Sequence, residues 1–163
     1  MQATPINAVL DSHGRANMHF PIIPIEQVPA PEVSGLDADR PVVLVVEDDG
    51  AVADTLVKIL NRSGYAAIAA CDGADAVETA LLVPPDLVIA DVALPGMSGI
   101  EVAVELKSKL PACRIVLLGV EHDACDAVAA ARIAELASAV VEKPVQPAEL
   151  LAKVSASLGR KPS

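Results

Sequence analysis

The sequence has almost no aromatic side chains. Only Phe20 and Tyr65 are aromatic among its 163 residues, and tryptophan is absent. Because hydrophobic residues nevertheless make up 53% of the chain, a buried core has to be built from Ala, Val, Leu and Ile. This length fits one ordinary domain of roughly 100 to 150 residues together with an extension.

Basic residues and long hydrophobic runs are also scarce. The 12 Lys and Arg residues are outnumbered by 22 Asp and Glu residues, which gives a formal net charge of -10. Binding to a nucleic-acid backbone depends on Lys and Arg, so the composition argues against a nucleic-acid partner. No apolar run reaches the roughly 18 residues of a membrane span, and the N-terminus lacks the pattern of a signal peptide. We therefore expect a cytoplasmic protein that is not inserted in a membrane.

Cysteine is rare as well. Cys71, Cys113 and Cys125 are odd in number and lack the spacing of metal ligands. We predict that they are small, reduced and mostly buried side chains. The histidines also lack partner spacing for a metal site or for nucleophilic catalysis and are expected to be solvated. They are His13, His19 and His122.

The first 39 residues differ in composition from the rest. They contain five prolines and no sustained helical or strand period, so we predict a Pro-rich, extended or disordered tail over residues 1–39. Its apolar stretch, Met18 to Ile25, has two interpretations: an inert leader, or a segment that docks on a partner or on the domain. The domain itself is expected over residues 40–159, with residues 160–163 as a C-terminal tail.

Five apolar runs follow the tail. Four are nearly continuous in hydrophobic residues, which is typical of parallel strands covered on both faces. The fifth, Ala66–Ala70, has small side chains and is expected at a sheet edge. The predicted strands are Val42–Val46, Ala66–Ala70, Leu87–Ala90, Ile115–Leu118 and Ala139–Val141.

Helical segments separate these strands. The first is expected from about Gly50 to Ser63, with Gly64 at its end, and the fourth from about Asp123 to Glu135. The predicted apolar face of the first helix is Val52, Leu56, Ile59 and Leu60, and that of the last is Leu150, Leu151, Val154 and Leu158. The alternation predicts an α/β fold, a doubly wound five-stranded parallel sheet with helices on both faces.

The ends of these helices carry further signals. Asp72 can cap the second helix, and Ser98 with Glu101 forms a capping box for the third. Pro147 suits the first turn of the last helix. The second helix is expected to end at Pro84 and Pro85, and the third at Pro111.

Charged residues stand at the carboxyl ends of the predicted strands. Glu47 and Asp48 follow the first strand, Asp91 follows the third, and Lys143 comes just after the fifth. Ligands of open α/β sheets bind at that edge. Three carboxylates would repel one another there, so a cation is required, and Mg²⁺ suits sites built only from oxygen. With Lys143 as a compact positive charge, the set suits phosphoryl transfer.

Three motifs carry a family resemblance: Val-Val-Glu-Asp-Asp, Asp-Val-Ala-Leu-Pro-Gly-Met-Ser-Gly beginning at Asp91, and Glu-Lys-Pro around Lys143. From about Pro41 to Leu158 the chain resembles the receiver domain of response regulators in bacterial two-component signalling. The resemblance implies a CheY-like, flavodoxin-like fold with strand order 2-1-3-4-5. It also implies a sensor histidine kinase or histidine phosphotransfer protein as phosphodonor, and a downstream protein target.

The resemblance also implies roles for individual residues. Asp91 would be the phosphoacceptor, with Lys143 beside the phosphoryl oxygens. Asp48 would bind Mg²⁺ directly, Glu47 through water, and the backbone carbonyl of Ala93 would complete the protein ligands. Pro144 would follow a cis peptide bond.

Two positions depart from the family pattern. Gly119 stands where receivers usually have Thr or Ser, and Val140 stands where an aromatic residue is common. Both halves of the usual switch are therefore missing. Backbone N–H groups near Gly119 could still bind the phosphoryl group, so coupling to a partner would be altered rather than lost.

Three functions follow from these observations. The first is a stand-alone response regulator that accepts phosphate on Asp91 and has no enzyme activity beyond self-phosphorylation and autodephosphorylation. The second is a pseudo-receiver that binds its partner whether phosphorylated or not. The third, a phosphatase or other hydrolase, is disfavoured because no acid or base follows Asp91. Simpler roles stay open: a solvated loop residue for Asp91, a surface lysine for Lys143, and an acidic helix entry for Asp49 and its neighbours.

Overall fold

A computed structural model describes residues 9–10, 16–17, 39–119 and 127–160, with the side chains of residues 127–130 left out. The chain divides into two compact units, residues 1–35 and 36–163. In the first unit, strands β1 (Val9–Leu10) and β2 (Ala16–Asn17) form a short antiparallel ladder that the sequence did not predict. The rest of the predicted tail, including Met18 to Ile25, lies outside the described residues. So do the three histidines and Cys125.

The second unit contains the predicted five-stranded sheet. Its strands are β3 (Val42–Val46), β4 (Ala66–Ala70), β5 (Leu87–Asp91), β6 (Arg114–Leu118) and β7 (Ala139–Val141). All neighbouring pairs are parallel, in the order β4-β3-β5-β6-β7. Numbered within this sheet alone, that order is 2-1-3-4-5, which confirms the predicted doubly wound, flavodoxin-like topology and the place of Ala66–Ala70 at an edge.

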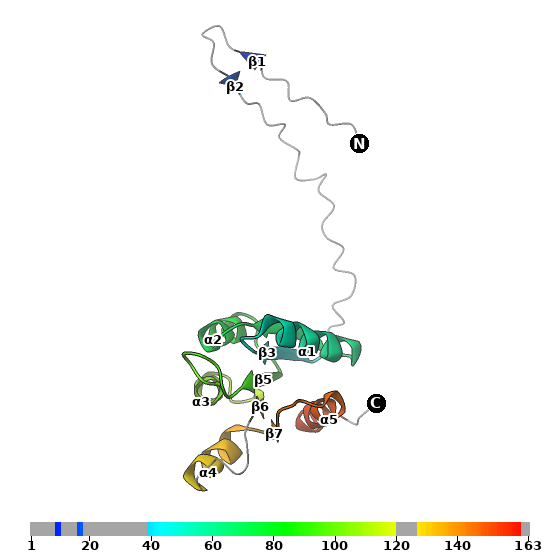
Figure 1. Cartoon of the computed structure of the whole chain (residues 1–163), viewed down its shortest axis with the longest axis vertical. Helices are drawn as coiled ribbons and strands as arrows, with labels where there is room; N and C mark the ends of the chain where they lie inside the picture. Colours follow the sequence, from blue (N-terminus) through cyan, green and yellow to red (C-terminus); the bar gives the residue numbers. More distant parts are fainter. Residues whose placement is uncertain (1–8, 11–15, 18–38, 120–126, 161–163) are drawn as a thin grey trace. The chain divides into compact units, whose positions relative to one another are not determined.

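Five helices cover the two faces of the sheet (Figure 1). They are α1 (Gly50–Arg62), α2 (Gly73–Leu82), α3 (Gly99–Lys109), α4 (Ala127–Leu136) and α5 (Pro147–Ser157). Residues of α1 and α5 pack on one face, and residues of α2, α3 and α4 on the other. Alternate strand residues point to opposite faces, which explains why β3 sends Val43 and Val45 to the α1 side and Leu44 and Val46 to the other.

The predicted helix ends are confirmed where the structure describes them. Asp49 caps α1 by accepting from Ala51 and Val52, while the Asp72 side chain caps α2. Ser98 and Glu101 form both hydrogen bonds of the capping box at α3, and Pro147 lies in the first turn of α5. After α1, Gly64 adopts a φ of +87°, which an L side chain rarely adopts. The predicted start of the fourth helix at Asp123 lies outside the described residues.

Two burial predictions were wrong. Val52 is 39% exposed, because the face of α1 on the sheet is centred on Ala53, Leu56 and Leu60. Cys71 is exposed, since it follows the edge strand β4 in a loop. Cys113 is buried as predicted, and that burial raises the pKa of its thiol to about 11. Within the described ranges, no helix has the length and hydrophobicity that a membrane crossing requires.

Both ends of the domain are fastened near Tyr65, at the amino ends of the strands. The Arg40 guanidinium donates to the backbone carbonyls of Asn61, at 2.8 Å, and of Tyr65. The Arg160 guanidinium lies over the Tyr65 ring, 5.6 Å from its centroid. Tyr65 immediately precedes β4, so this corner lies at the sheet edge opposite the carboxyl ends.

Candidate functional site

The carboxyl ends of β3, β5 and β7 bring the predicted site residues together. Val46 pairs with Ala90 in the parallel ladder, so the next residues, Glu47 and Asp91, lie at the same level of the sheet. Lys143 follows the end of β7 by two residues. The site is therefore a product of strand register, as expected for parallel strands that end at one edge.

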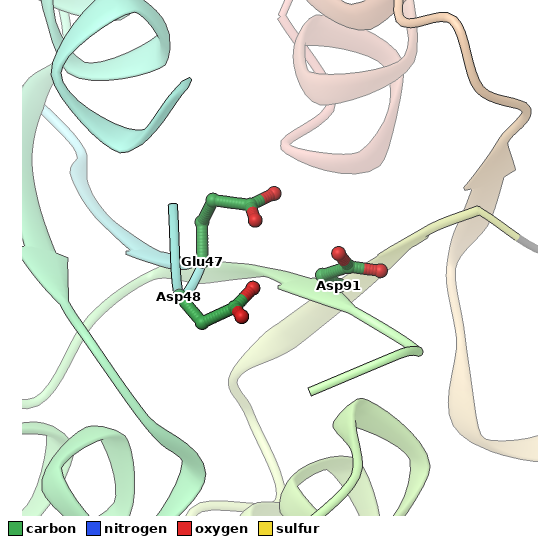
Figure 2. A group of neighbouring side chains, drawn as sticks. All are labelled: Glu47, Asp48 and Asp91. Carbon is green, nitrogen blue, oxygen red and sulfur yellow. The ribbon is translucent and has the colours of Figure 1, made fainter. Parts of the chain in front are cut away.

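Glu47, Asp48 and Asp91 form one acidic cluster. Each residue offers a carboxylate oxygen, and these three oxygens all lie within 4.8 Å of one another. Figure 2 shows the two β3-derived side chains reaching toward the same space as Asp91. Glu47 and Asp91 are each only 3% exposed, whereas Asp48 is exposed. The simpler interpretation of Asp91 as a solvated loop residue is therefore wrong.

Lys143 provides the positive charge of the cluster. Its Nζ lies 2.5 Å from Asp91 Oδ2 and 3.5 Å from Glu47 Oε2. The lysine side chain is 42% exposed, so it approaches the buried carboxylates from the surface. It is thus more than an ordinary surface lysine. The peptide bond between Lys143 and Pro144 is cis, as the resemblance implied.

The surroundings shift two ionisable groups in this cluster. Burial raises the pKa of Glu47, although the backbone N–H of Asp49 and the charge of Lys143 act in the opposite direction. For Lys143, partial burial alone would lower the pKa, but the hydrogen bond and charge of Asp91, with those of Glu47, outweigh it and raise the pKa. Mutual stabilisation of unlike charges thus keeps the lysine protonated.

The donor set fits a hard divalent cation. Mg²⁺ binds oxygen at about 2.0–2.1 Å, so two ligands on opposite sides of one ion lie up to about 4.2 Å apart. Three oxygens within 4.8 Å of one another are thus close to the spacing that one ion requires. That Glu47 acts through water stays a prediction.

The loop after Asp91 holds that side chain from the other side. The backbone N–H of Ala93 donates to Asp91 Oδ1 at 3.0 Å. Gly99, the first residue of α3, lies so close that a Cβ there would overlap the Asp91 carbonyl oxygen. The role of the Ala93 carbonyl as a metal ligand stays a prediction.

Of the two positions that depart from the family pattern, Gly119 lies beside the cluster and Val140 lies within β7. Gly119 follows β6 with a φ of +82°, and its backbone N–H donates to the Val141 carbonyl at 2.9 Å. This N–H is therefore already bonded within the protein. The expectation that backbone N–H groups near Gly119 bind a phosphoryl group stays a prediction, since Val120 lies outside the described residues. Val140 is partly buried and packs against the core.

Sequence reasoning missed two features of this site, the left-handed conformation of Gly119 and the close approach of Gly99. A glycine in the sequence shows that a side chain is missing, but not the φ angle or the neighbouring atoms that require its absence. The position of Gly99 directly after an N-cap was no signal either, since Gly50 also begins a helix after its N-cap and a Cβ there meets nothing within 4 Å.

Comparison with known proteins agrees with this geometry. The chain is 37% identical over 127 residues to the DNA-binding response regulator MtrA of Mycolicibacterium smegmatis, covering 77% of this chain and 54% of MtrA. It thus spans about half the length of the curated relatives it matches.

Solved structures with the same fold include two response regulators. A putative response regulator of Chloroflexus aurantiacus is 29% identical with a TM-score of 0.65, covering 74% of this chain and 99% of that one. A CheY-like receiver domain protein of Methanospirillum hungatei has a TM-score of 0.67 at 24% identity, covering 74% and 94%. The family model for the response regulator receiver domain matches residues 43–155. The chain therefore belongs to the response regulator receiver domain family.

Proposed function

We propose that this chain is a magnesium-dependent response regulator that accepts a phosphoryl group on Asp91. The observation that carries the proposal is the placement of a buried Asp91 carboxylate within 2.5 Å of Lys143 Nζ, inside a cluster of three carboxylates. Receiver domains work with histidine kinases, so the proposed donor is a sensor histidine kinase or a histidine phosphotransfer protein.

The proposed step is a displacement at phosphorus. An oxygen of Asp91 forms a bond to phosphorus while the bond from phosphorus to the donor histidine nitrogen breaks, and that nitrogen keeps the electron pair and takes a proton. Asp48 and Asp91, with Glu47 through a water, would hold Mg²⁺, which would supply positive charge to neutralise the phosphoryl oxygens. Lys143 supplies the second positive charge, and Ala93 orients Asp91 through its backbone N–H.

Phosphorylation of Asp91 is tested by intact mass measurement after treatment with acetyl phosphate. We expect one phosphoryl adduct on the wild-type chain in Mg²⁺ and none when EDTA removes the ion. Asp91→Asn should abolish the adduct because the amide is not nucleophilic. Asp49→Asn is the matched control, since Asp49 caps α1 and asparagine caps equally well. An Asp91→Asn variant labelled as strongly as wild type would eliminate the proposal.

The proposal also covers the output. We propose that the signal passes by protein contact and that the chain has no enzyme activity beyond self-phosphorylation and autodephosphorylation. The net charge of -10 supports protein contact over nucleic-acid binding. The stand-alone arrangement and the cytoplasmic location stay predictions. Immunoblotting of fractionated cell extracts, which gives the native mass and compartment, tests both.

A second candidate, a pseudo-receiver adaptor, is favoured by Gly119 and Val140. Neither position carries the hydroxyl or aromatic side chain of the usual switch, and the Gly119 N–H is already bonded to Val141. This function predicts the same partner affinity with and without beryllofluoride, which mimics the phosphoryl group. A large change in that affinity, measured by calorimetry with a captured partner, would reject the adaptor.

A further inference from the structure

Gly119 lies directly against the two residues that carry the proposed chemistry. A Cβ built on Gly119 would lie 3.3 Å from Asp91 Oδ1, and 3.5 Å and 3.7 Å from Cδ and Cε of Lys143. The first of these distances is tighter than ordinary packing, so the Asp91 carboxylate would have to move by a few tenths of an ångström, whereas the two distances to Lys143 are ordinary van der Waals contacts. The stem of Lys143 therefore passes over Gly119 on its way to Asp91.

Gly119 is also fixed relative to Lys143. Its N–H donates to the carbonyl of Val141, two residues before Lys143 on the same strand end. Because this hydrogen bond continues the pairing of β6 with β7, the backbone at Gly119 cannot retreat from Lys143 without breaking the end of the ladder. An added side chain would therefore displace the Asp91 carboxylate, and with it the contact with Lys143, rather than the backbone.

Comparison with other glycines of the domain distinguishes the effect of this contact from the effect of backbone conformation. Gly64, Gly96 and Gly159 also have positive φ values, yet a Cβ on any of them would meet nothing within 4 Å. At those positions glycine is needed only for its conformation. At Gly119 it is needed for its conformation and for the space that a side chain would fill.

We propose that Gly119 is a positioning residue, whose bare backbone leaves the space in which the Asp91 carboxylate meets Lys143. The inference rests on the proposed function, because it gives the contact between Lys143 and Asp91 a role in phosphoryl transfer. It gives Gly119 a function of its own in this chain. Comparison with the family pattern alone shows only that the usual hydroxyl is missing at this position.

The first test compares Gly119→Ala with Gly159→Ala. Both variants place an L side chain at positive φ, so both should lower the thermal midpoint. Only Gly119→Ala should slow phosphorylation by acetyl phosphate in saturating Mg²⁺, by roughly tenfold or more, because a small displacement of a positioned group is costly. Equal rates for the two folded variants would overturn the proposal. If Gly119→Ala does not fold, Gly119→Asn and Gly159→Asn replace the pair, since asparagine tolerates this conformation.

The second test asks whether the effect acts through Lys143. In a Lys143→Ala background there is no contact between Asp91 and Lys143 left to disturb, so adding Gly119→Ala should slow phosphorylation clearly less than it does in the wild-type background. If Gly119→Ala lowers the phosphorylation rate as much in this background as in the wild-type background, Gly119 does not act through Lys143 and the inference is refuted. Such a cycle isolates coupling between neighbours.

A third measurement does not depend on phosphorylation. Mass spectrometry of peptides gives the rate at which a small N-hydroxysuccinimide ester acylates Lys143, which the carboxylates should slow. We expect faster acylation in Gly119→Ala than in wild type or Gly159→Ala. If the wild-type chain takes up no phosphate, the proposed function fails, and this rate alone decides the inference. Unchanged acylation would refute it.

Discussion

Two of the three carboxylates at the site are buried, and a single lysine offsets them. Lys143 Nζ contacts Asp91 Oδ2 and Glu47 Oε2, which are also oxygens that a divalent cation would use. Lysine and cation therefore favour the same ionised carboxylates and compete for them. This gives one residue two opposing effects, one on ion binding and one on phosphoryl transfer.

Lys143→Ala should separate those effects. Without the lysine the cluster is more negative, so we expect Mg²⁺ to bind several-fold more tightly in calorimetric titrations. Phosphorylation by acetyl phosphate should nevertheless slow by about tenfold or more, because one charge on the phosphoryl oxygens is lost. Lys153→Ala is the control, since Lys153 pairs with Glu149 on the surface of α5. Weaker Mg²⁺ binding in Lys143→Ala would contradict this account.

The raised pKa of Glu47 predicts a pH dependence. Burial raises this pKa above 4.5, so as the pH falls from neutral Glu47 takes up a proton earlier than an ordinary glutamate, and Mg²⁺ affinity should weaken there. The native state then binds more protons than the unfolded chain, so this group's contribution to stability increases as the pH falls through the folded pKa toward 4.5. In the Glu47→Gln variant, the weakening of Mg²⁺ affinity that accompanies protonation of Glu47 should be absent when the affinity is measured as a function of pH. An unchanged pH profile in that variant would assign the step to another group.

At the scale of elements, the start of α3 connects the site to the fold. Ser98 caps this helix, and Gly99 packs on the carbonyl of Asp91. The neighbouring loop is held in the same way, because a Cβ on Gly73 at the start of α2 would lie 2.7 Å from the Met97 carbonyl oxygen. Two helix N-termini thus clamp the segment that follows Asp91.

Gly99→Ala should therefore destabilise the domain. The new methyl group would overlap the Asp91 carbonyl, and overpacking of this kind costs about 1–3 kcal/mol. Gly50→Ala is a matched control, since Gly50 also begins a helix and a Cβ there meets nothing within 4 Å. Urea unfolding measures both free energies. The clamp would be disproved by equal stability of the two variants.

At the scale of the whole molecule, net charge determines which partners can approach. The relative MtrA is named as a DNA-binding response regulator, but this chain matches about half of it and carries a net charge of -10. We expect the full chain to cause no shift of duplex DNA in native gels near physiological salt, before or after phosphorylation. A basic DNA-binding protein serves as the positive control. Salt-sensitive binding of this chain would contradict output by protein contact alone.

Much of this fold and site could be predicted from the sequence, for a physical reason. Continuous apolar runs identify buried parallel strands, and parallel strands bring their carboxyl ends to one edge, so Glu47, Asp48 and Asp91 had to meet. The burial of side chains at the border of a helix's packed face could not be predicted in the same way. Val52, for example, lies just beside the packed face of α1. The conformation of Gly119 depends on contacts between strands distant in sequence, which the amino-acid pattern does not specify.

The contacts of Arg40 and Arg160 with Tyr65 determine where any label or fused protein at either end of this domain would begin. Arg40 and Arg160 contact the corner around Tyr65 from the two ends of the domain, while Asp91 lies at the opposite, carboxyl-terminal edge of the same sheet. A fluorophore, affinity handle or fused protein joined before residue 39 or after residue 160 therefore starts a full strand length away from the acidic rim. Labelled versions of the chain are accordingly suited to measuring phosphate uptake without shielding its acceptor.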